Sequence, residues 1–311
     1  MTISELLKRA AAELQPKKIV CEEDRYLGRF EAEILMAHVL KKDRAWMKIH
    51  SDKVLSSQCS VKFKKLVARR RRHEPVAYIL GEKEFYGLRL ITDKRALIPR
   101  PESELLVELV VGAHGVRPPL VPHGVRHPAG SGRAPHAPTI WDVGTGSGAI
   151  ALAIAKNLPR SHVIATDISS SAIALAKKNA KRLKAKNISF LKADLLSPSL
   201  LPLFARIREG GLIITANLPY LPASDKTKMD TDVVKYEPSS ALFAGKDGLK
   251  LIEKFLRQLA SSRLPFFNLF LEYDPPQTKK LRTLAKSLFT KMKIQIHKDL
   301  AKRDRVMEIY Y

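Results

Sequence analysis

Residues 139–148 read TIWDVGTGSG, an apolar stretch of strand length that leads directly into three closely spaced glycines. Gly144, Gly146 and Gly148 stand at every second position, which permits a tight turn and lets a ligand approach the backbone closely. The spacing differs from the dinucleotide-binding pattern GxGxxG, and no GK[ST] follows as in a Walker loop. The stretch therefore predicts a strand, a ligand-binding turn and then a helix, without a triphosphate site.

The chain after residue 139 alternates between apolar runs of strand length and helical patterns. Seven runs are predicted to be strands: Thr139–Val143, His162–Asp167, Ile188–Leu191, Leu212–Ala216, Phe267–Glu272, Lys293–His297 and Val306–Tyr310. Helical patterns such as 149–155 and 172–183 separate the earlier strands, whereas only a short polar stretch separates the last two. This order predicts an α/β fold with a mostly parallel seven-stranded sheet, helices on both faces and an antiparallel hairpin at its end.

One acidic residue ends the second strand and another follows the third, at positions suited to binding a nucleoside. Asp167 stands 23 residues beyond Gly144, where a carboxylate can accept hydrogen bonds from both ribose hydroxyls. Asp194 follows the next strand. This ordered set resembles the S-adenosylmethionine site of Rossmann-like class I methyltransferases. The resemblance implies that the cofactor contacts Gly144, Thr145, Gly146, Ser147, Gly148 and Asp167, with Asp194 and Leu195 beside the adenine.

The fourth strand is followed by Asn217-Leu218-Pro219-Tyr220, at the sheet edge where open α/β folds hold reactive groups. An amide nitrogen is a poor nucleophile because its lone pair is delocalised into the carbonyl group. The Asn217 side-chain oxygen and the Leu218 backbone oxygen could accept both N–H groups of a substrate amide, while the Tyr220 ring stacks on a planar group. All four residues are predicted to be catalytic and substrate-binding, with Asn217 also beside the cofactor. The alternative is an ordinary strand-ending turn, because Asn and Pro both favour turns.

Longer motifs over much of the chain are similar to those of one family. They are Glu31–His38 (EAEILMAH), Glu74–Gly81 (EPVAYILG), Glu84–Gly87 (EFYG), Leu97–Leu106 (LIPRPESELL), Glu237-Pro238, Ala241-Leu242 and Gly245–Leu249 (GKDGL). In these motifs the chain resembles the PrmC/HemK family, the release factor glutamine methyltransferases. The resemblance implies methyl transfer from S-adenosylmethionine to the side-chain N5 of glutamine in the Gly-Gly-Gln motif of class I peptide chain release factors. It also implies that the N-terminal helical domain helps to dock the release factor.

Three features depart from the pattern of that family. Leu218 replaces the usual proline of NPPY, which removes the rigidity of a double proline but keeps a backbone oxygen as acceptor. Leu195 stands where the family often has an aromatic residue, and the segment 271–277 (LEYDPPQ) lacks the usual glycine after the strand. Because NLPY also resembles the motif of rRNA adenine dimethyltransferases, an RNA adenine-N6 methyltransferase is the alternative function.

Changes in composition along the chain indicate its domains. Residues 1–73 have helical apolar spacing throughout and are predicted to form a small N-terminal helical domain. Residues 74–100 are predicted to be a hairpin linker, and 101–311 the methyltransferase domain. Within it, the segment 112–138 holds six of the 19 prolines, five of the 15 glycines and four of the nine histidines, but no acid. This composition predicts a flexible basic insertion rather than a packed element.

The charge balance is strongly basic. Lys and Arg number 55 against 31 Asp and Glu, a formal net charge of +24 at pH 7, which favours a polyanionic neighbour such as RNA or the ribosome. One dense run consists of Lys62, Lys64, Lys65 and Arg69–Arg72, and ten further cations lie between 279 and 305. Cations that line one groove would indicate weak RNA or ribosome contact, whereas dispersed cations would be solvated or would face an acidic release factor. A non-catalytic RNA- or ribosome-binding protein is a third hypothesis.

Cysteine usage and the N-terminus bear on compartment. The chain has two cysteines, Cys21 and Cys59, without CxxC spacing, which argues against a disulfide framework or structural zinc and suits a reducing cytosol. The four histidines of 112–138 fit no compact metal geometry. Residues 1–15 are predicted to be an amphipathic helix rather than a signal peptide, and no apolar run is long enough to span a bilayer. The expected protein is a cytoplasmic enzyme that uses neither a metal nor a membrane.

Overall fold

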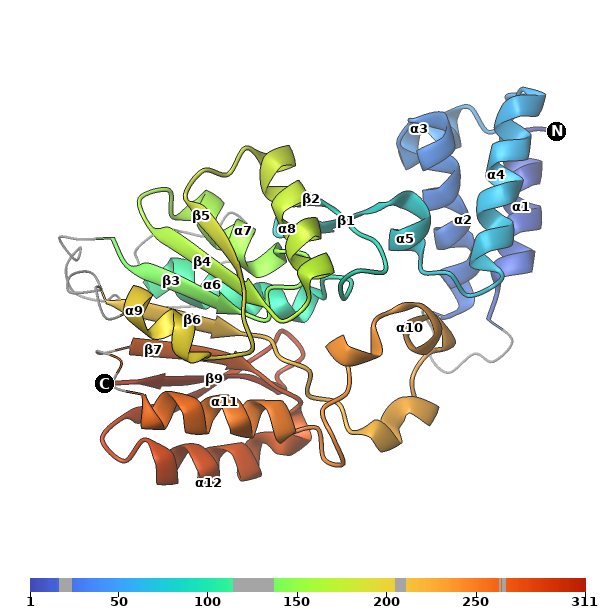
Figure 1. Ribbon diagram of the computed structural model, residues 1–311. Helices are drawn as coiled ribbons and strands as arrows, with labels where there is room; N and C mark the ends of the chain where they lie inside the picture. The colour runs from blue at the N-terminus through green and yellow to red at the C-terminus, as the bar shows by residue number, and fades with distance from the viewer. Residues whose placement is uncertain (17–23, 114–136, 205–210, 263, 265–266) are drawn as a thin grey trace. The chain divides into compact units, whose positions relative to one another are not determined.

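The structure is a computed structural model of residues 1–311 (Figure 1). It describes all residues except 17–23, 114–136, 205–210, 263 and 265–266. Contacts divide the chain into an N-terminal unit, residues 1–82 with 230–236, and a C-terminal unit, residues 83–229 with 237–311. The first unit extends past the predicted domain boundary at residue 73.

The N-terminal unit is helical in its described residues. Its helices are α1 (Ile3–Leu14), α2 (Asp24–Leu40), α3 (Arg44–Ile49), α4 (Ser57–Arg70), α5 (Val76–Leu80) and α10 (Thr231–Tyr236). At the start of α1, the Thr2 hydroxyl accepts a hydrogen bond from the Glu5 N–H at 3.2 Å, and the Glu5 carboxylate accepts one from the Thr2 N–H at 2.9 Å. Such a capping box satisfies two N–H groups that the helix itself cannot bond. Helix α5, which falls inside the predicted linker, adds Ile79 to the apolar core of this unit.

A two-stranded hairpin opens the C-terminal unit, as the sequence predicts. It consists of β1 (Glu82–Phe85) and β2 (Leu88–Ile91), joined at Gly87, whose φ of 72° lies in the left-handed region. Leu90 of β2 is fully buried. The hairpin leads through residues 92–100 to a short 3₁₀ helix, η1 (Pro101–Ser103), and then to α6 (Glu104–Ala113).

The large sheet has seven strands in the order β5-β4-β3-β6-β7-β9-β8. They are β3 (Thr139–Val143), β4 (His162–Asp167), β5 (Ile188–Lys192), β6 (Leu212–Ala216), β7 (Phe267–Glu272), β8 (Lys293–Lys298) and β9 (Asp304–Tyr310). The first five pair in parallel, whereas β9 pairs antiparallel with both β7 and β8. All seven predicted strands and the terminal hairpin are therefore confirmed.

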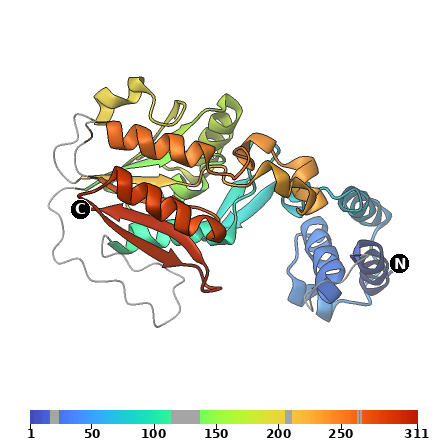
Figure 2. The same cartoon turned by 90° about the horizontal axis from the view of Figure 1, so that it is seen from below.

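Helices cover both faces of this sheet (Figures 1 and 2). On one face lie α6, α7 (Ala149–Asn157) and α8 (Ser170–Leu183); on the other lie α9 (Leu201–Phe204), α11 (Lys250–Ser261) and α12 (Thr278–Leu288). Each face of the sheet has its own apolar core, and neighbouring residues of a strand point into opposite cores. Ile213 packs in the core with α6 and α7, whereas Leu212 and Ile214 pack in the core with α11 and α12. The predicted arrangement, a sheet with helices on both faces, is thus confirmed, and both faces of the sheet are buried.

Several short connections lie beyond the strand ends. They include the 3₁₀ helices η2 (Pro198–Leu200), η3 (Ala223–Thr227), η4 (Ser239–Ala241) and η5 (Pro275–Gln277). The predicted flexible insertion at 112–138 falls almost wholly on residues 114–136, which lie outside the described part of the chain. Helix α6 runs to Ala113, and β3 begins at Thr139.

Candidate active site

The register of the parallel strands brings the predicted site residues to one edge of the sheet. Val143 pairs with Thr166 of β4 and with Ala216 of β6. The residues that follow, Gly144, Asp167 and Asn217, therefore stand level at the carboxyl ends of three neighbouring strands. The strand order reverses between β3 and β6, which is where open α/β sheets leave a crevice for a ligand.

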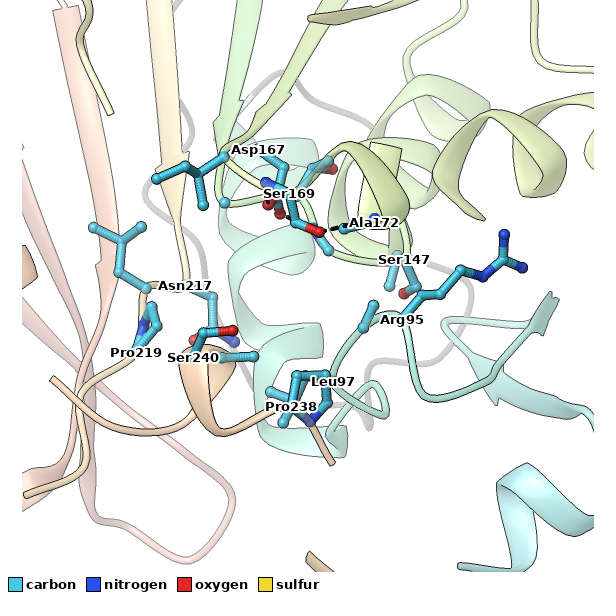
Figure 3. Close-up of a pocket in the computed structure, with 18 of the residues that line it drawn as sticks. Arg95, Leu97, Ser147, Asp167, Ser169, Ala172, Asn217, Pro219, Pro238 and Ser240 are labelled. Atoms are coloured by element: carbon cyan, nitrogen blue, oxygen red, sulfur yellow. Dashed lines mark hydrogen bonds between the residues drawn. The ribbon is translucent and has the colours of Figure 1, made fainter. Parts of the chain in front are cut away.

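A cavity of about 730 Å³ opens at this edge, and its lining belongs entirely to the C-terminal unit. Figure 3 shows Asp167, Ser169 and Ala172 together where β4 passes into α8, and Asn217 and Pro219 where β6 ends. The predicted site residues that line it are Gly144, Thr145, Gly146, Ser147, Asp167, Asp194, Leu195, Asn217, Leu218 and Pro219. Of the other two, Gly148 begins α7 just behind the loop, and Tyr220 is treated below.

The glycine turn is held by its own backbone and by Asp167. Gly144, Gly146 and Gly148 have φ values of 72°, 55° and 83°, so all three use the left-handed conformation that other residues adopt at a cost. The Asp167 carboxylate accepts hydrogen bonds from the N–H of Gly146 and the N–H of Ser169, both at 2.8 Å. Burial raises the pKa of Asp167, while these two hydrogen bonds act to lower it. The carboxylate is thus fixed in place and keeps further lone pairs for donors in the cavity.

The third strand end contributes two residues with different surroundings. Asp194 forms an ion pair with Lys254 of α11 at 2.6 Å, and both side chains are about half exposed. Leu195 is buried and has a φ of 48°, an uncommon conformation for leucine. Its side chain belongs to the apolar core and also lines the cavity. This part of the site therefore offers an apolar wall with a carboxylate at its rim.

The Asn217 side chain is oriented by a residue far away in sequence. Its Nδ2 donates a hydrogen bond of 2.8 Å to the Ser103 hydroxyl, which follows the PRPE segment at the end of η1. The next residue, Leu218, is buried, and a Cβ added at Gly144 would lie 3.1 Å from its Cδ2. Leucine in place of proline thus packs directly onto the glycine turn. The contact explains how the chain accommodates the departure at this position.

Tyr220 lies outside the described residues that line the cavity, although it was predicted to stack on the substrate. Its hydroxyl donates to Glu272 Oε1 at 3.3 Å, and burial raises the pKa of this tyrosine. Its backbone oxygen accepts a hydrogen bond of 2.8 Å from Gln277 Nε2, which also donates to the Asp247 backbone oxygen at 3.0 Å. Gly248 packs against the same carbonyl group, because a Cβ there would lie 1.9 Å from the Tyr220 oxygen. Tyr220 anchors the loop in this structure.

Sequence reasoning missed the residues that brace this loop. Ser103, Glu272 and Gln277 all fall within motifs that the sequence singled out, but no local pattern assigns them a contact with residues 217–220. Gln277 supplies a function for the segment 271–277, whose departure from the family pattern had no explanation. The sequence does place polar residues at and just after the end of a strand of this sheet. This indicates that they lie at the same edge as residues 217–220, but not which of those residues they contact.

Two buried carboxylates accompany the site. Asp142, in the strand before the glycine turn, accepts a hydrogen bond of 2.8 Å from the Thr215 hydroxyl, and burial raises its pKa to about 6. Burial raises the pKa of Glu272 to about 7, against the lowering effects of Ser103, Arg305 and Tyr220. Perturbed carboxyl groups beside a crevice are typical of functional sites.

A further carboxylate secures the linker segment along the cavity. Glu237 accepts hydrogen bonds from the Ile98 N–H at 2.9 Å and from the Arg100 guanidinium at 2.5 Å. Ile98 and Arg100 both line the cavity. The Glu-Pro and Pro-Arg-Pro motifs are therefore joined in space, and together they form one wall.

The described residues contain no group of three His, Cys, Asp or Glu side chains that could hold a metal ion. The histidines of the segment 112–138 lie outside that part of the chain. Among the described helices, none is both long and apolar enough to cross a membrane.

The basic run of α4 is partly neutralised within the N-terminal unit. Arg69 pairs with Glu74, Arg70 with Glu31 and Asp232, and Arg71 with Glu13. Lys62, Lys64 and Lys65 are exposed. Three of the seven cations in this run are thus engaged in ion pairs, which reduces the charge available to a phosphate backbone.

Comparison with known proteins adds family relationships to this geometry. A family model described as "PrmC N-terminal domain" matches residues 5–81, and one described as "Methyltransferase domain" matches residues 137–202. The chain is 34% identical over 289 residues to a release factor glutamine methyltransferase of Rhodopirellula baltica, covering 90% of this chain and 88% of the relative. It is also 34% identical over 306 residues to a release factor glutamine methyltransferase of Buchnera aphidicola subsp. Schizaphis graminum, covering 98% of each chain.

A solved structure shares the fold at low identity. The hMettl16 catalytic domain, in complex with the MAT2A 3′UTR hairpin 1, aligns with a TM-score of 0.51 and 15% identity. The alignment covers 88% of this chain and 90% of that chain. The likeness concerns the arrangement of the sheet and helices, and at this identity it carries nothing about substrate.

Proposed function

Because the chain belongs to the release factor glutamine methyltransferase family, we propose that it methylates the glutamine of the Gly-Gly-Gln motif in a class I peptide chain release factor. The methyl group moves from S-adenosylmethionine to the side-chain amide nitrogen N5. The observation that carries the proposal is the level placement of the glycine turn, Asp167 and Asn217 around one cavity. This placement supports the proposal because the residues proposed to hold the cofactor and the loop proposed to bind the amide line the same cavity.

The residues present fit S-adenosylmethionine. The turn of Gly144, Thr145, Gly146, Ser147 and Gly148 leaves no Cβ at three positions, and the Asp167 carboxylate is held at the cavity with free lone pairs for ribose hydroxyls. Asp194 and Leu195 form the part of the wall assigned to the adenine. When bound, the cofactor supplies an electrophilic methyl group on a sulfonium sulfur.

The loop Asn217–Tyr220 supplies acceptors for the substrate amide. With Nδ2 engaged by Ser103, the Asn217 side chain presents Oδ1 as the acceptor, and the Leu218 backbone oxygen is the proposed second acceptor. Two acceptors would hold both N–H groups and stabilise the positive charge that develops on nitrogen during attack. Pro219 lines the cavity beside them, and Tyr220, which is proposed to stack on a planar group of the substrate, donates its hydroxyl to Glu272.

The proposed partner is the release factor itself, docked in part by the N-terminal helical unit. Because the proposed substrate is a protein of translation termination, the proposed compartment is the cytoplasm. The remaining exposed cations are proposed to give at most weak contact with RNA or the ribosome, since Arg69, Arg70 and Arg71 are internally paired.

The test offers labelled S-adenosylmethionine together with purified release factor and bare ribosomal RNA, followed by peptide mass spectrometry. One added methyl group on the Gly-Gly-Gln glutamine is the expected result. Label in RNA alone would overturn the proposal in favour of the adenine-N6 alternative that NLPY and the +24 charge suggest. Absence of label in both targets, with RNA binding that weakens with salt, would favour the non-catalytic hypothesis.

A further inference from the structure

We infer that Ser103 and Glu272 are positioning residues that fix which way the Asn217 carboxamide faces. The two residues form a relay at the cavity, from the buried Glu272 carboxylate through the hydroxyl of Ser103, which lines the cavity, to the amide. The inference rests on the proposed function, because it concerns how the acceptor for the substrate glutamine is oriented. It adds residues to the site that the motif at 217–220 does not contain.

The strands bring the three side chains together. Ala216 of β6 pairs with Leu271 of β7, so that Asn217 and Glu272, the next residues, lie level on adjacent strands. Ser103 reaches them from η1, and its Oγ lies 2.8 Å from Asn217 Nδ2. Ser103 and Glu272 are both buried, with 3% and 1% exposure. A polar cluster this well buried requires its hydrogen bonds to be satisfied.

The direction of the Asn217 amide matters for catalysis. With Nδ2 toward Ser103, Oδ1 remains as an acceptor for a substrate N–H. The flipped amide would present N–H groups to the N–H groups of the substrate and would repel them. A serine hydroxyl can donate or accept, so Ser103 alone does not select one orientation. Selection requires that the Ser103 hydrogen be directed to another acceptor.

Glu272 is that acceptor. Its Oε1 accepts a hydrogen bond from the Tyr220 hydroxyl at 3.3 Å, whereas Oε2 is buried and receives none from the described residues. Ser103 is close enough to act on the pKa of this carboxyl, which it lowers. An ionised carboxylate can only accept hydrogen bonds. The inference therefore assigns the Ser103 hydroxyl hydrogen to Glu272, whose buried Oε2 is the open acceptor, and this leaves the Ser103 oxygen to accept from Asn217.

Several charged and polar groups from neighbouring elements act on the pKa of Glu272. Arg305 of β9 favours the ionised carboxylate, Glu102 of η1 opposes it, and Tyr220 and Ser103 offer hydroxyls. Burial raises the pKa of Glu272 to about 7. A protonated Glu272 can itself donate to Ser103, which removes the bias on Asn217. Methylation is therefore expected to increase as Glu272 ionises.

The first experiment measures release factor methylation by Ser103→Ala, Ser103→Thr and Ser161→Ala. Ser161 is the matched control, a serine with 4% exposure that is not among the described residues lining the cavity. For Ser103→Ala we expect kcat to fall about 10- to 100-fold, with KM and the cofactor Kd changed by less than about threefold. Ser103→Thr restores the hydroxyl and should stay within about threefold of wild type. A kcat for Ser103→Ala equal to that of Ser161→Ala would overturn the inference.

The second experiment compares the pH profiles of kcat for wild type and Glu272→Gln. The wild-type rate is expected to rise through about pH 7 and to lose that step in the variant. Burial also raises the pKa of Asp142 to about 6, so only the step removed by Glu272→Gln is assigned to the relay. An identical step in both proteins would contradict the role of Glu272. A wild-type chain that leaves the release factor unmethylated would instead overturn the proposed function, and the inference with it.

Discussion

The two sides of the cavity are built in different ways. The cofactor side consists of the turn 144–148 and Asp167, whose carboxylate accepts hydrogen bonds from backbone N–H groups 21 and two residues away, at Gly146 and Ser169. The substrate side consists of residues 217–220, which are held by side chains 114, 52 and 57 residues away, namely Ser103, Glu272 and Gln277. The first side needs only the pairing of consecutive strands β3 and β4, whereas the second needs contacts between segments much farther apart in the chain. Substitutions should therefore affect the two sides differently.

The largest expected effect is that of Asn217→Ala on the substrate side. Removing a positioned acceptor of this kind should lower kcat by about 100- to 1,000-fold. Cofactor affinity should change much less, because Asp167 and the glycine turn remain. Single-turnover methylation and calorimetric cofactor binding measure the two quantities. Asn157→Ala is the control, since the Asn157 side chain donates to the Ala153 backbone oxygen of its own helix and is not among the described residues that line the cavity. Unchanged activity would show that Asn217 has no catalytic role.

Gly248→Ala should distort the substrate side from behind. The new Cβ would lie 1.9 Å from the Tyr220 backbone oxygen and 2.8 Å from Gln277 Nε2, so the loop must move. Destabilisation of about 3 kcal/mol is expected, since strain at a φ of 76° adds to the clash. Gly87→Ala is the control for backbone strain, because its φ is 72° and nothing lies within 4 Å of the added Cβ. Denaturant unfolding should separate the two variants; equal losses would refute the steric account.

Glu272→Gln should show how much the buried ionised carboxylate lowers the free energy of unfolding. Its folded pKa of about 7 lies above the ordinary value of 4.5, so its favourable contribution is complete below about pH 4.5 and is lost as the pH rises through about 7. The variant should match wild type at pH 5 and be about 2–3 kcal/mol more stable at pH 8. Unfolding free energies at both pH values test this. A constant difference would mean that Glu272 does not titrate as proposed.

Asp167→Asn should weaken the cofactor side without altering the substrate side. An amide cannot accept hydrogen bonds on both of its polar atoms, so one of the bonds from Gly146 and Ser169 is lost together with the charge. The cofactor Kd should rise about 10-fold, whereas kcat at saturating cofactor should fall by less than about threefold. A kcat loss as large as that of Asn217→Ala would show that the two sides are coupled.

Lys254→Ala should have the smallest effect. Its ion pair with Asp194 is about half exposed on both sides, and such pairs contribute about 0.2–1 kcal/mol. Both the cofactor Kd and the unfolding free energy should stay close to wild type, within about twofold for Kd. Lys280→Ala, which removes exposed pairs with both Asp247 and Glu253 away from the cavity lining, is the control. A larger effect specific to Lys254 would indicate that the cofactor contacts this lysine or depends on its pairing with Asp194.

Much of the fold was predictable because its signals are local. Strand-length apolar runs and helical spacing predicted all seven strands and the antiparallel end of the sheet, which the structure confirms. The hairpin β1–β2 was also predicted from its turn residues, whereas α5 was not, because five residues are too few to show helical periodicity. The family assigned from the motifs is confirmed by relatives that cover most of the chain.

The position of Tyr220 shows where prediction from a motif stops. As part of NLPY the ring was predicted to stack on the substrate, and that role stays a prediction. The motif did not predict that the Tyr220 hydroxyl donates to Glu272, or that Tyr220 is not among the described residues that line the cavity. The motif records which residue types occur in sequence. It does not record which strand lies alongside, and that neighbour determines where a side chain finds its hydrogen bond.

By itself, the sequence determined which segments form the strands of the sheet, the glycine turn, the carboxylate at the end of β4 and the family. These features depend on residues close together in the chain, whose spacing dictates backbone conformation directly. Only the tertiary structure decided that Ser103, Gln277 and Glu272 brace residues 217–220, that Leu218 packs on Gly144, and that Glu237 secures the linker. The physical reason is strand register: parallel pairing brings residues far apart in sequence to the same edge, and burial there makes their hydrogen bonds obligatory.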